Sequence, residues 1–156
     1  MEYRETFDSK TSPACPDSKL SPEQEELFYS VAYNAYEQGD YPVAARLFRQ
    51  LVLTTPFVRD YWKGLAAAEQ MQQAYEAALH AWGMVALLDD SDPLPHFHAG
   101  ECYFFLNDFV EAGKALDLAE ERQAIHSPSN LQLAYSIQTL KSRITPWQRP
   151  SMESVQ

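Results

Sequence analysis

The chain has 156 residues, of which 46% are hydrophobic and 13% aromatic, a length and composition that suit one globular domain with a buried core. Its 12 basic and 22 acidic residues give a net charge of −10, which argues against nucleic acid or anionic lipid as partners because both require basic surface. A mean hydropathy of −0.40 without a long apolar run argues against stable membrane insertion. The first ten residues lack a signal-peptide pattern, and the two cysteines lie in unrelated surroundings, so we expect a cytoplasmic protein.

The N-terminal segment, residues 1–20, contains prolines, serines and mixed charges without helical periodicity. This composition is typical of a mobile segment. Ser21 and Pro22 then occupy the N-cap and first position of a helix, and Glu23 follows in the first turn, where the helix dipole favours negative charge. The sequence therefore predicts a helix that begins at about Ser21.

A shift of 34 residues aligns the sequence with itself and divides it into units 25–58, 59–92 and 93–126. Each unit has a small residue at its eighth place, an aromatic residue at its seventeenth, alanine at its twentieth and a large apolar residue at its twenty-fourth. This is the tetratricopeptide pattern, in which two antiparallel helices approach closely at the small residues. It predicts an all-α fold of three tandem helix-turn-helix repeats in a right-handed superhelical array. The matching residues are Ala32, Ala66 and Gly100; Tyr41, Tyr75 and Phe109; Ala44, Ala78 and Ala112; and Phe48, Trp82 and Leu116.

The turns inside the repeats fall at Gly39-Asp40, Gln72-Gln73 and Asn107-Asp108, and the middle pair is the weakest turn former. After the third unit, apolar residues spaced by three or four predict a capping helix at about 129–144. Such a helix covers the last apolar face of a repeat array. The repeat domain is thus expected to span residues 21–145, with a C-terminal tail over 146–156.

The concave side of such an array is lined by the first helix of each repeat, and Tyr29, Tyr33 and Tyr36 share one face of the first of these helices. Phe97 and Phe104 occupy equivalent concave places in the third repeat, and Gln70 in the second offers an amide suited to a peptide backbone. The alternative is that these rings are ordinary core. Three tyrosines on one face favour a groove for an extended peptide, because each ring pairs an apolar face with a polar tip.

Three segments carry a further resemblance. They are LFYSVAYNAYEQGDYPVAARLFRQL at 27–51, DYWKGLAAAEQMQQAYEAALHAWGMVALLDDSDP at 60–93 and HFHAGECYFFLNDFVEAGKAL at 96–116. Through them the chain resembles the tetratricopeptide chaperones of bacterial type III secretion, known as class II or translocator chaperones. The resemblance implies a protein of the bacterial cytoplasm that keeps a hydrophobic translocator, or a secreted effector, soluble until export. It implies no cofactor and no enzymatic activity.

In that family an extended client segment of the type Pro-x-Leu-x-x-Pro lies on aromatic residues of the first two repeats. The matching positions here are Tyr29, Tyr33, Tyr36, Phe48, Tyr61 and Leu65. The family also carries an additional N-terminal helix that contributes to homodimerisation, whereas residues 1–20 contain little to form one, so a homodimer is left open. The alternative function is a generic tetratricopeptide scaffold, although scaffolds that bind charged tails usually line the groove with several basic residues, and here Lys63 is nearly alone.

The segment HFHAGEC is the strongest candidate for other chemistry. His98 and Cys102 are four residues apart and face one side of a helix, as two metal ligands would. His96 points elsewhere, and no second cluster supplies further ligands, so we expect packing rather than a metal site or a thiol nucleophile. Phosphate-binding loops and hydrolase motifs are missing from the sequence, which leaves no catalytic residue to name.

Overall fold

A computed structural model describes residues 19–148, which form seven α-helices and no strand. The predicted N-terminal segment lies almost entirely outside the described residues, as do residues 149–156. The all-α fold expected from the repeat pattern is confirmed. The helices are α1 (Pro22–Glu37), α2 (Tyr41–Thr54), α3 (Arg59–Met71), α4 (Tyr75–Leu88), α5 (Leu94–Phe105), α6 (Phe109–His126) and α7 (Leu131–Gln148).

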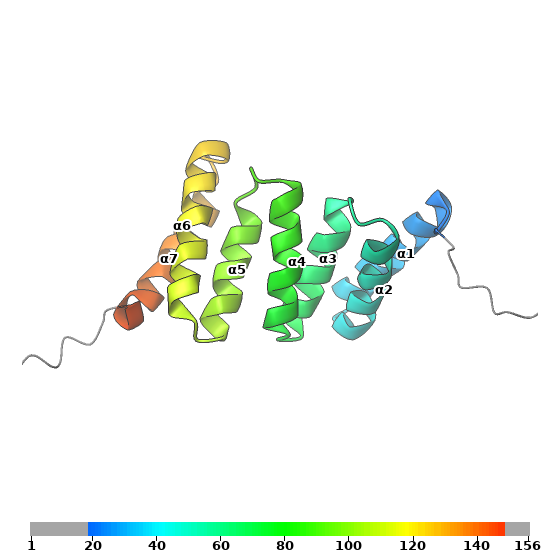
Figure 1. Ribbon diagram of the computed structural model, residues 1–156, viewed down its shortest axis with the longest axis horizontal. Coiled ribbons are helices and arrows are strands. Elements are labelled where there is room, and N and C mark those ends of the chain that lie inside the picture. The colour runs from blue at the N-terminus through cyan, green and yellow to red at the C-terminus, as the bar shows by residue number, and fades with distance from the viewer. Residues whose placement is uncertain (1–18, 149–156) are drawn as a thin grey trace, which may run out of the picture.

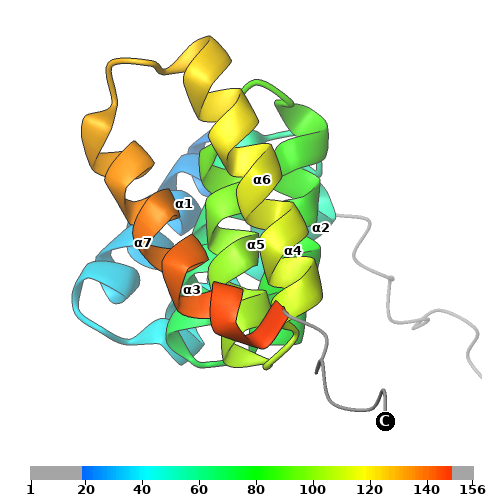
Figure 2. The same cartoon turned by 90° about the vertical axis from the view of Figure 1, so that its left-hand side faces the viewer.

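The helices stand side by side in chain order, with α1 at one end of the long axis and α7 at the other (Figure 1). Each packs chiefly on the helices next to it in the sequence, and α1 also contacts α3. A view along the array shows α1 and α3 on one side and α2 and α4 on the other, with α7 crossing in front (Figure 2). The first helices of the repeats thus share one side of the array, where the sequence pattern places the concave surface.

The helix ends follow local rules. Ser21 caps α1, its hydroxyl accepting from the Gln24 amide at 3.2 Å while the Gln24 side chain accepts from the Ser21 amide at 2.9 Å. This reciprocal pair is a capping box, and it confirms the predicted start of the first helix. The side chains of Asp40 and Asp108 cap α2 and α6 in the same manner, accepting from backbone amides three residues ahead. Leu20 packs against the core, so ordered packing begins one residue before the predicted boundary.

The close-packed positions are those that recur every 34 residues. The three alanines at the twentieth place are fully buried, as are Ala32 and Ala66, and the large apolar residues at the twenty-fourth place are at most 4% exposed. Gly100 is glycine for a steric reason: a Cβ there would lie 2.8 Å from the side chain of Leu116. Small residues therefore let the helix pairs approach while the large ones fill the space beside them.

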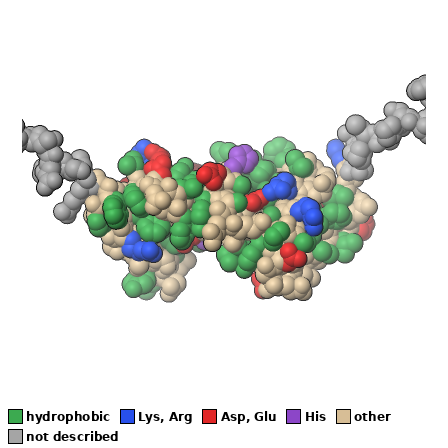
Figure 3. Space-filling model, turned by 90° about the horizontal axis from the view of Figure 1, so that it is seen from below, with side chains coloured by type: hydrophobic (Ala, Val, Ile, Leu, Met, Phe, Trp, Pro, Cys, Tyr) green, Lys and Arg blue, Asp and Glu red, His purple; other side chains and the backbone are tan. Residues whose placement is uncertain are grey.

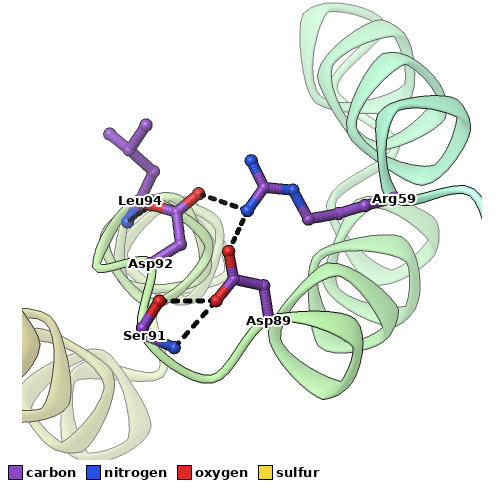
Figure 4. Close-up of polar contacts among 5 residues, drawn as sticks. All are labelled: Arg59, Asp89, Ser91, Asp92 and Leu94. Carbon is purple, nitrogen blue, oxygen red and sulfur yellow. Dashed lines mark hydrogen bonds and ion pairs between the residues drawn. The ribbon is translucent and has the colours of Figure 1, made fainter.

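Arg59, at the start of α3, contacts the segment that joins α4 to α5 (Figure 4). It pairs with Asp89 after α4 and lies 3.6 Å from an oxygen of Asp92. Asp92 accepts from the Leu94 amide at 2.9 Å, a contact that ties the segment between α4 and α5 to the first residue of α5. Hydrogen bonds from Ser91, with Arg59 nearby, lower the pKa of the Asp89 carboxyl. These contacts hold the start of α3 against the segment between α4 and α5.

The last helix extends beyond the predicted end at 144. It continues through Pro146 to Gln148, so the prediction that the tail begins at Pro146 was wrong. Two contacts hold the extra turn: Trp147 stacks on Phe109 with ring centroids 5.7 Å apart, and the Gln148 side chain donates to the Phe109 carbonyl at 2.9 Å. Tertiary contacts with α6 here outweigh the helix-breaking effect of proline.

The turn of the middle repeat offers a stability prediction. Gln73 has a φ of 62°, in the left-handed region that Gly39 (80°) and Asn107 (60°) occupy in the other two repeats. Because a long side chain is disfavoured there, Gln73→Gly is expected to raise the free energy of unfolding by about 0.5–1 kcal/mol. Urea denaturation measures the change. The matched control is Gln72→Gly, whose φ of −83° gains nothing from glycine, and equal effects of both changes would contradict the prediction.

Candidate functional site

A cavity of about 320 Å³ opens among the first four helices. One wall is aromatic and comes from the concave face of α1, while α3 supplies the floor. The side chains of α2 and α4 close the far side. The lining residues are Tyr29, Tyr33, Tyr36, Phe48, Asp60, Lys63, Gly64, Ala67 and Trp82. We call this cavity the tyrosine pocket.

The shape of the tyrosine pocket depends on Gly64. A Cβ at this position would lie 2.3 Å from the ring of Phe48, a distance that non-bonded carbon atoms do not adopt. Glycine therefore allows the Phe48 ring to lie directly against the backbone of α3. The ring itself is only 2% exposed, so it supports the pocket wall and offers a ligand little surface.

The tyrosines form a connected aromatic surface. Tyr29 lies 6.4 Å from Tyr33 and 6.0 Å from Phe48, measured between ring centroids. Burial raises the pKa of Tyr29, helped by the charge of Asp60, and burial together with Tyr41 raises the pKa of Tyr36. Both hydroxyls thus stay neutral at physiological pH and remain hydrogen-bond donors. Tyr33 is 51% exposed and presents the largest free ring surface of the three to a ligand.

The floor of the tyrosine pocket holds one acid and one base. Asp60 and Lys63 both come from α3, and neither forms an ion pair within residues 19–148. Among the other basic side chains of residues 19–148, most form ion pairs: Arg49, for example, pairs with Glu69, a carboxylate that is only 6% exposed. The pocket thus combines apolar walls with two free charges at its base, a combination suited to a peptide with both apolar and polar groups.

Trp82 joins the tyrosine pocket to the rest of the concave side through polar contacts. Its indole N–H donates to the side-chain oxygen Oε1 of Gln70 at 2.9 Å, and the side-chain Nε2 of Gln70 donates to Glu101 at 3.0 Å. His98 stacks on Trp82 with centroids 4.5 Å apart and places its Nδ1 2.8 Å from the same Glu101 oxygen. These bonds hold Trp82 in one orientation.

The predicted site residues fall into three groups. Tyr29, Tyr33, Tyr36 and Phe48 meet in the tyrosine pocket. Tyr61 stands at its edge, with its ring 5.7 Å from Tyr29, whereas Leu65 is 7% exposed and belongs to the core. The remaining three predicted residues, Gln70, Phe97 and Phe104, lie outside the pocket.

Gln70 was expected to bind a peptide backbone through its side-chain amide. In the structure the nitrogen of that amide donates to Glu101 and the oxygen accepts from Trp82. Its predicted contact with a peptide backbone remains a prediction. Gly64 and Trp82 were not among the site residues predicted from the sequence. For Trp82 a signal existed: it is the 34-residue equivalent of Phe48, which was named.

The segment HFHAGEC serves packing in the structure. Cys102 is fully buried and His98 is engaged with Glu101 and Trp82. Within residues 19–148 no three His, Cys, Asp or Glu side chains gather closely enough to hold a metal ion. His96 is half-buried, and burial beside Arg122 lowers its pKa, which favours a neutral ring. In the same part of the chain, no helix is both long and apolar enough to cross a membrane.

The buried thiol gives a chemical prediction. Burial raises the pKa of Cys102 to about 12, so almost none of it is thiolate at pH 8. In a Cys15→Ser variant, which leaves Cys102 as the one cysteine, we expect Ellman's reagent to react at least about 100-fold more slowly with native protein than with protein in urea. Rapid labelling of the native protein would instead mean that α5 opens readily.

The comparisons with known proteins agree with the tetratricopeptide fold. A family model for the tetratricopeptide repeat matches residues 60–92. Low calcium response locus protein H of Yersinia pestis is 32% identical over 104 residues, which are 67% of this chain and 62% of that protein. The solved structure of the type III secretion chaperone SycD of Yersinia enterocolitica, in complex with a peptide of the translocator YopD, is similar with a TM-score of 0.76 and 29% identity. That match covers 83% of this chain and 98% of SycD. The chain belongs to the family of type III secretion chaperones.

A second family structure extends the match. PcrH in complex with the chaperone binding region of PopD has a TM-score of 0.76 and 28% identity, and the match covers 83% of this chain and 97% of PcrH. The chain spans 62% of the length of the Yersinia pestis protein. The resemblance inferred from residues 27–116 is thus confirmed at the level of the family.

Proposed function

We propose that this protein is a type III secretion chaperone that binds an extended segment of a hydrophobic translocator in the tyrosine pocket. The observation that carries the proposal is the pocket itself: three tyrosines of α1 meet Phe48 and Trp82 above a floor with two free charges. Two family members with the same fold have been solved with bound partner segments, SycD with a peptide of the translocator YopD and PcrH with the chaperone binding region of PopD. The proposal places the protein in the bacterial cytoplasm and assigns it no catalytic step.

The pocket also sets the expected affinity. A segment of the type Pro-x-Leu-x-x-Pro would bury two or three apolar side chains, each contributing about 1.5–3 kcal/mol before the cost of ordering the peptide. A short peptide is therefore expected to bind with a Kd of about 1 μM or weaker. A complete translocator must reach tighter binding through contacts outside the tyrosine pocket.

The direct test is recovery of the client. Tagged protein is isolated from its own bacterium grown under secretion-inducing conditions, and its partners are identified by mass spectrometry. We expect a hydrophobic, export-destined protein that precipitates when expressed alone and stays in solution when co-expressed with this chain. Light scattering of the same samples reports whether the chain is a homodimer. Recovery of only folded cytoplasmic proteins would instead support a general tetratricopeptide scaffold.

A further inference from the structure

A second aromatic surface lies at the opposite end of the array from the tyrosine pocket. Four ring contacts join α4, α5, α6 and α7 in series, with centroids 5.0 to 5.9 Å apart. Two of its rings are largely in solvent, Phe105 at 54% and Trp147 at 69% exposed. Seen from the end of the array that carries the turns within the repeats, hydrophobic side chains gather on the α7 side beside a basic one (Figure 3). The rings in contact order are Tyr75, Phe105, Phe104, Phe109 and Trp147.

This surface encloses a cavity of about 440 Å³, lined by Phe104, Phe105, Asn107, Phe109, Arg143 and Trp147. Its lining has one cation and no carboxylate. The Arg143 guanidinium lies 4.6 Å from the centre of the Phe104 ring, a cation–π contact that orients it while leaving its N–H groups free. Within residues 19–148 it forms no ion pair, whereas Lys141, on the same helix, pairs with Asp117 and Glu120.

The surroundings of Arg143 explain why no internal acid neutralises it. Helix α7 contains no Asp or Glu. Glu101 lines a neighbouring cavity together with Arg143, but its Oε2 atom already accepts from Gln70 and lies against His98. The Asp108 side chain caps α6 by accepting from the Glu111 amide. The free guanidinium is therefore available to an external carboxylate, the anion whose geometry it matches.

We propose that this cavity is a second client site, which binds a segment carrying an aspartate or glutamate next to an aromatic residue. The carboxylate pairs with Arg143, and the neighbouring ring stacks between Phe105 and Trp147. The inference rests on the proposed function, since it takes the occupant to be another part of the same client. When one client occupies two weak sites on the same chain, its overall affinity rises because the second contact forms at a high effective concentration. The second site would thus add the binding that the tyrosine pocket alone lacks.

The test uses the full chain and a defined probe, the peptide Ac-Ala-Asp-Phe-Ala-NH2, titrated while the indole and arginine N–H signals are followed by NMR. We expect weak binding that shifts the Trp147 and Arg143 signals. Replacing aspartate by asparagine in the probe, or Arg143→Gln in the protein, should each weaken binding about tenfold, and the two changes together little more. Arg46→Gln, an exposed arginine of α2 outside the cavity, is the matched control. Equal binding of both probes would overturn the proposal.

A second measurement separates this inference from the proposed function. Arg143→Gln is expected to weaken binding of the whole translocator several-fold and to leave binding of a Pro-x-Leu-x-x-Pro peptide unchanged. If the translocator bound Arg143→Gln as well as the parent chain, the inference would fall while the tyrosine pocket stood. If the probe bound but no translocator did, the proposed function would fail instead. If deletion of residues 149–156 strengthened probe binding, the cavity would normally be occupied by the C-terminal residues of this chain, and the proposal would be overturned.

Discussion

Replacing Tyr33 and Tyr36 together by alanine is expected to weaken binding of a Pro-x-Leu-x-x-Pro peptide about 100-fold or more. Both rings line the tyrosine pocket, and large aromatic side chains at the centre of a binding site usually contribute most of the binding free energy. Fluorescence anisotropy with a labelled peptide measures the change. If the double variant bound the peptide with a Kd within twofold of that of the parent chain, the tyrosine pocket would not be the peptide-binding site.

The same double variant should remain folded. Tyr33 is 51% exposed, and Tyr36 is half-buried with its ring 5.4 Å from that of Tyr41, so their removal deprives the core of little buried surface. Circular dichroism checks this directly. Tyr135→Ala is the matched control, because this tyrosine of α7 is 70% exposed and lies outside the tyrosine pocket. It is expected to leave binding of the short peptide unchanged.

Trp82→Ala is expected to lower the free energy of unfolding by about 3–5 kcal/mol. The side chain is 4% exposed, stacks on His98 and donates its indole N–H to Gln70. Alanine would leave a cavity and an unpaired amide oxygen, and both effects destabilise the folded state. Urea denaturation monitored by circular dichroism gives the value.

Trp147→Ala provides the comparison for Trp82, because Trp147 is 69% exposed and its removal should cost less than about 1 kcal/mol. Similar losses for the two variants would mean that Trp82 does not anchor the second repeat. At temperatures where the Trp82→Ala variant is still folded, we also expect it to bind the peptide more weakly than the parent chain, because the Trp82 ring forms part of the wall of the tyrosine pocket.

The repeat pattern made most of the fold predictable. A 34-residue period specifies which side chains must be small, and Ala44, Ala78 and Ala112 are fully buried for that reason. The face of α1 that carries Tyr29, Tyr33 and Tyr36 followed from helical spacing alone, since residues three and four apart share a face. These features depend on local geometry and on the repetition of one unit.

Features that depend on contacts between distant segments were not predictable from the sequence. The need for glycine at position 64 arises from the placement of the Phe48 ring, which no spacing rule specifies. The pairing of Arg49 with the buried Glu69 joins α2 to α3, and each residue alone reads as an ordinary surface charge. The last turn of α7 exists because Trp147 and Gln148 contact Phe109, although the proline before them predicted an end.

The packing of each helix on its neighbours in the chain also bears on how the protein folds. Contacts between elements close in sequence give a low contact order, and proteins of this kind fold within microseconds to milliseconds. All residues of the tyrosine pocket fall between Tyr29 and Trp82, so a growing polypeptide contains the complete set before α5 has been synthesised. Because the contacts among α1 to α4 need no later part of the chain, we expect the tyrosine pocket to be able to form before the C-terminal helices are complete.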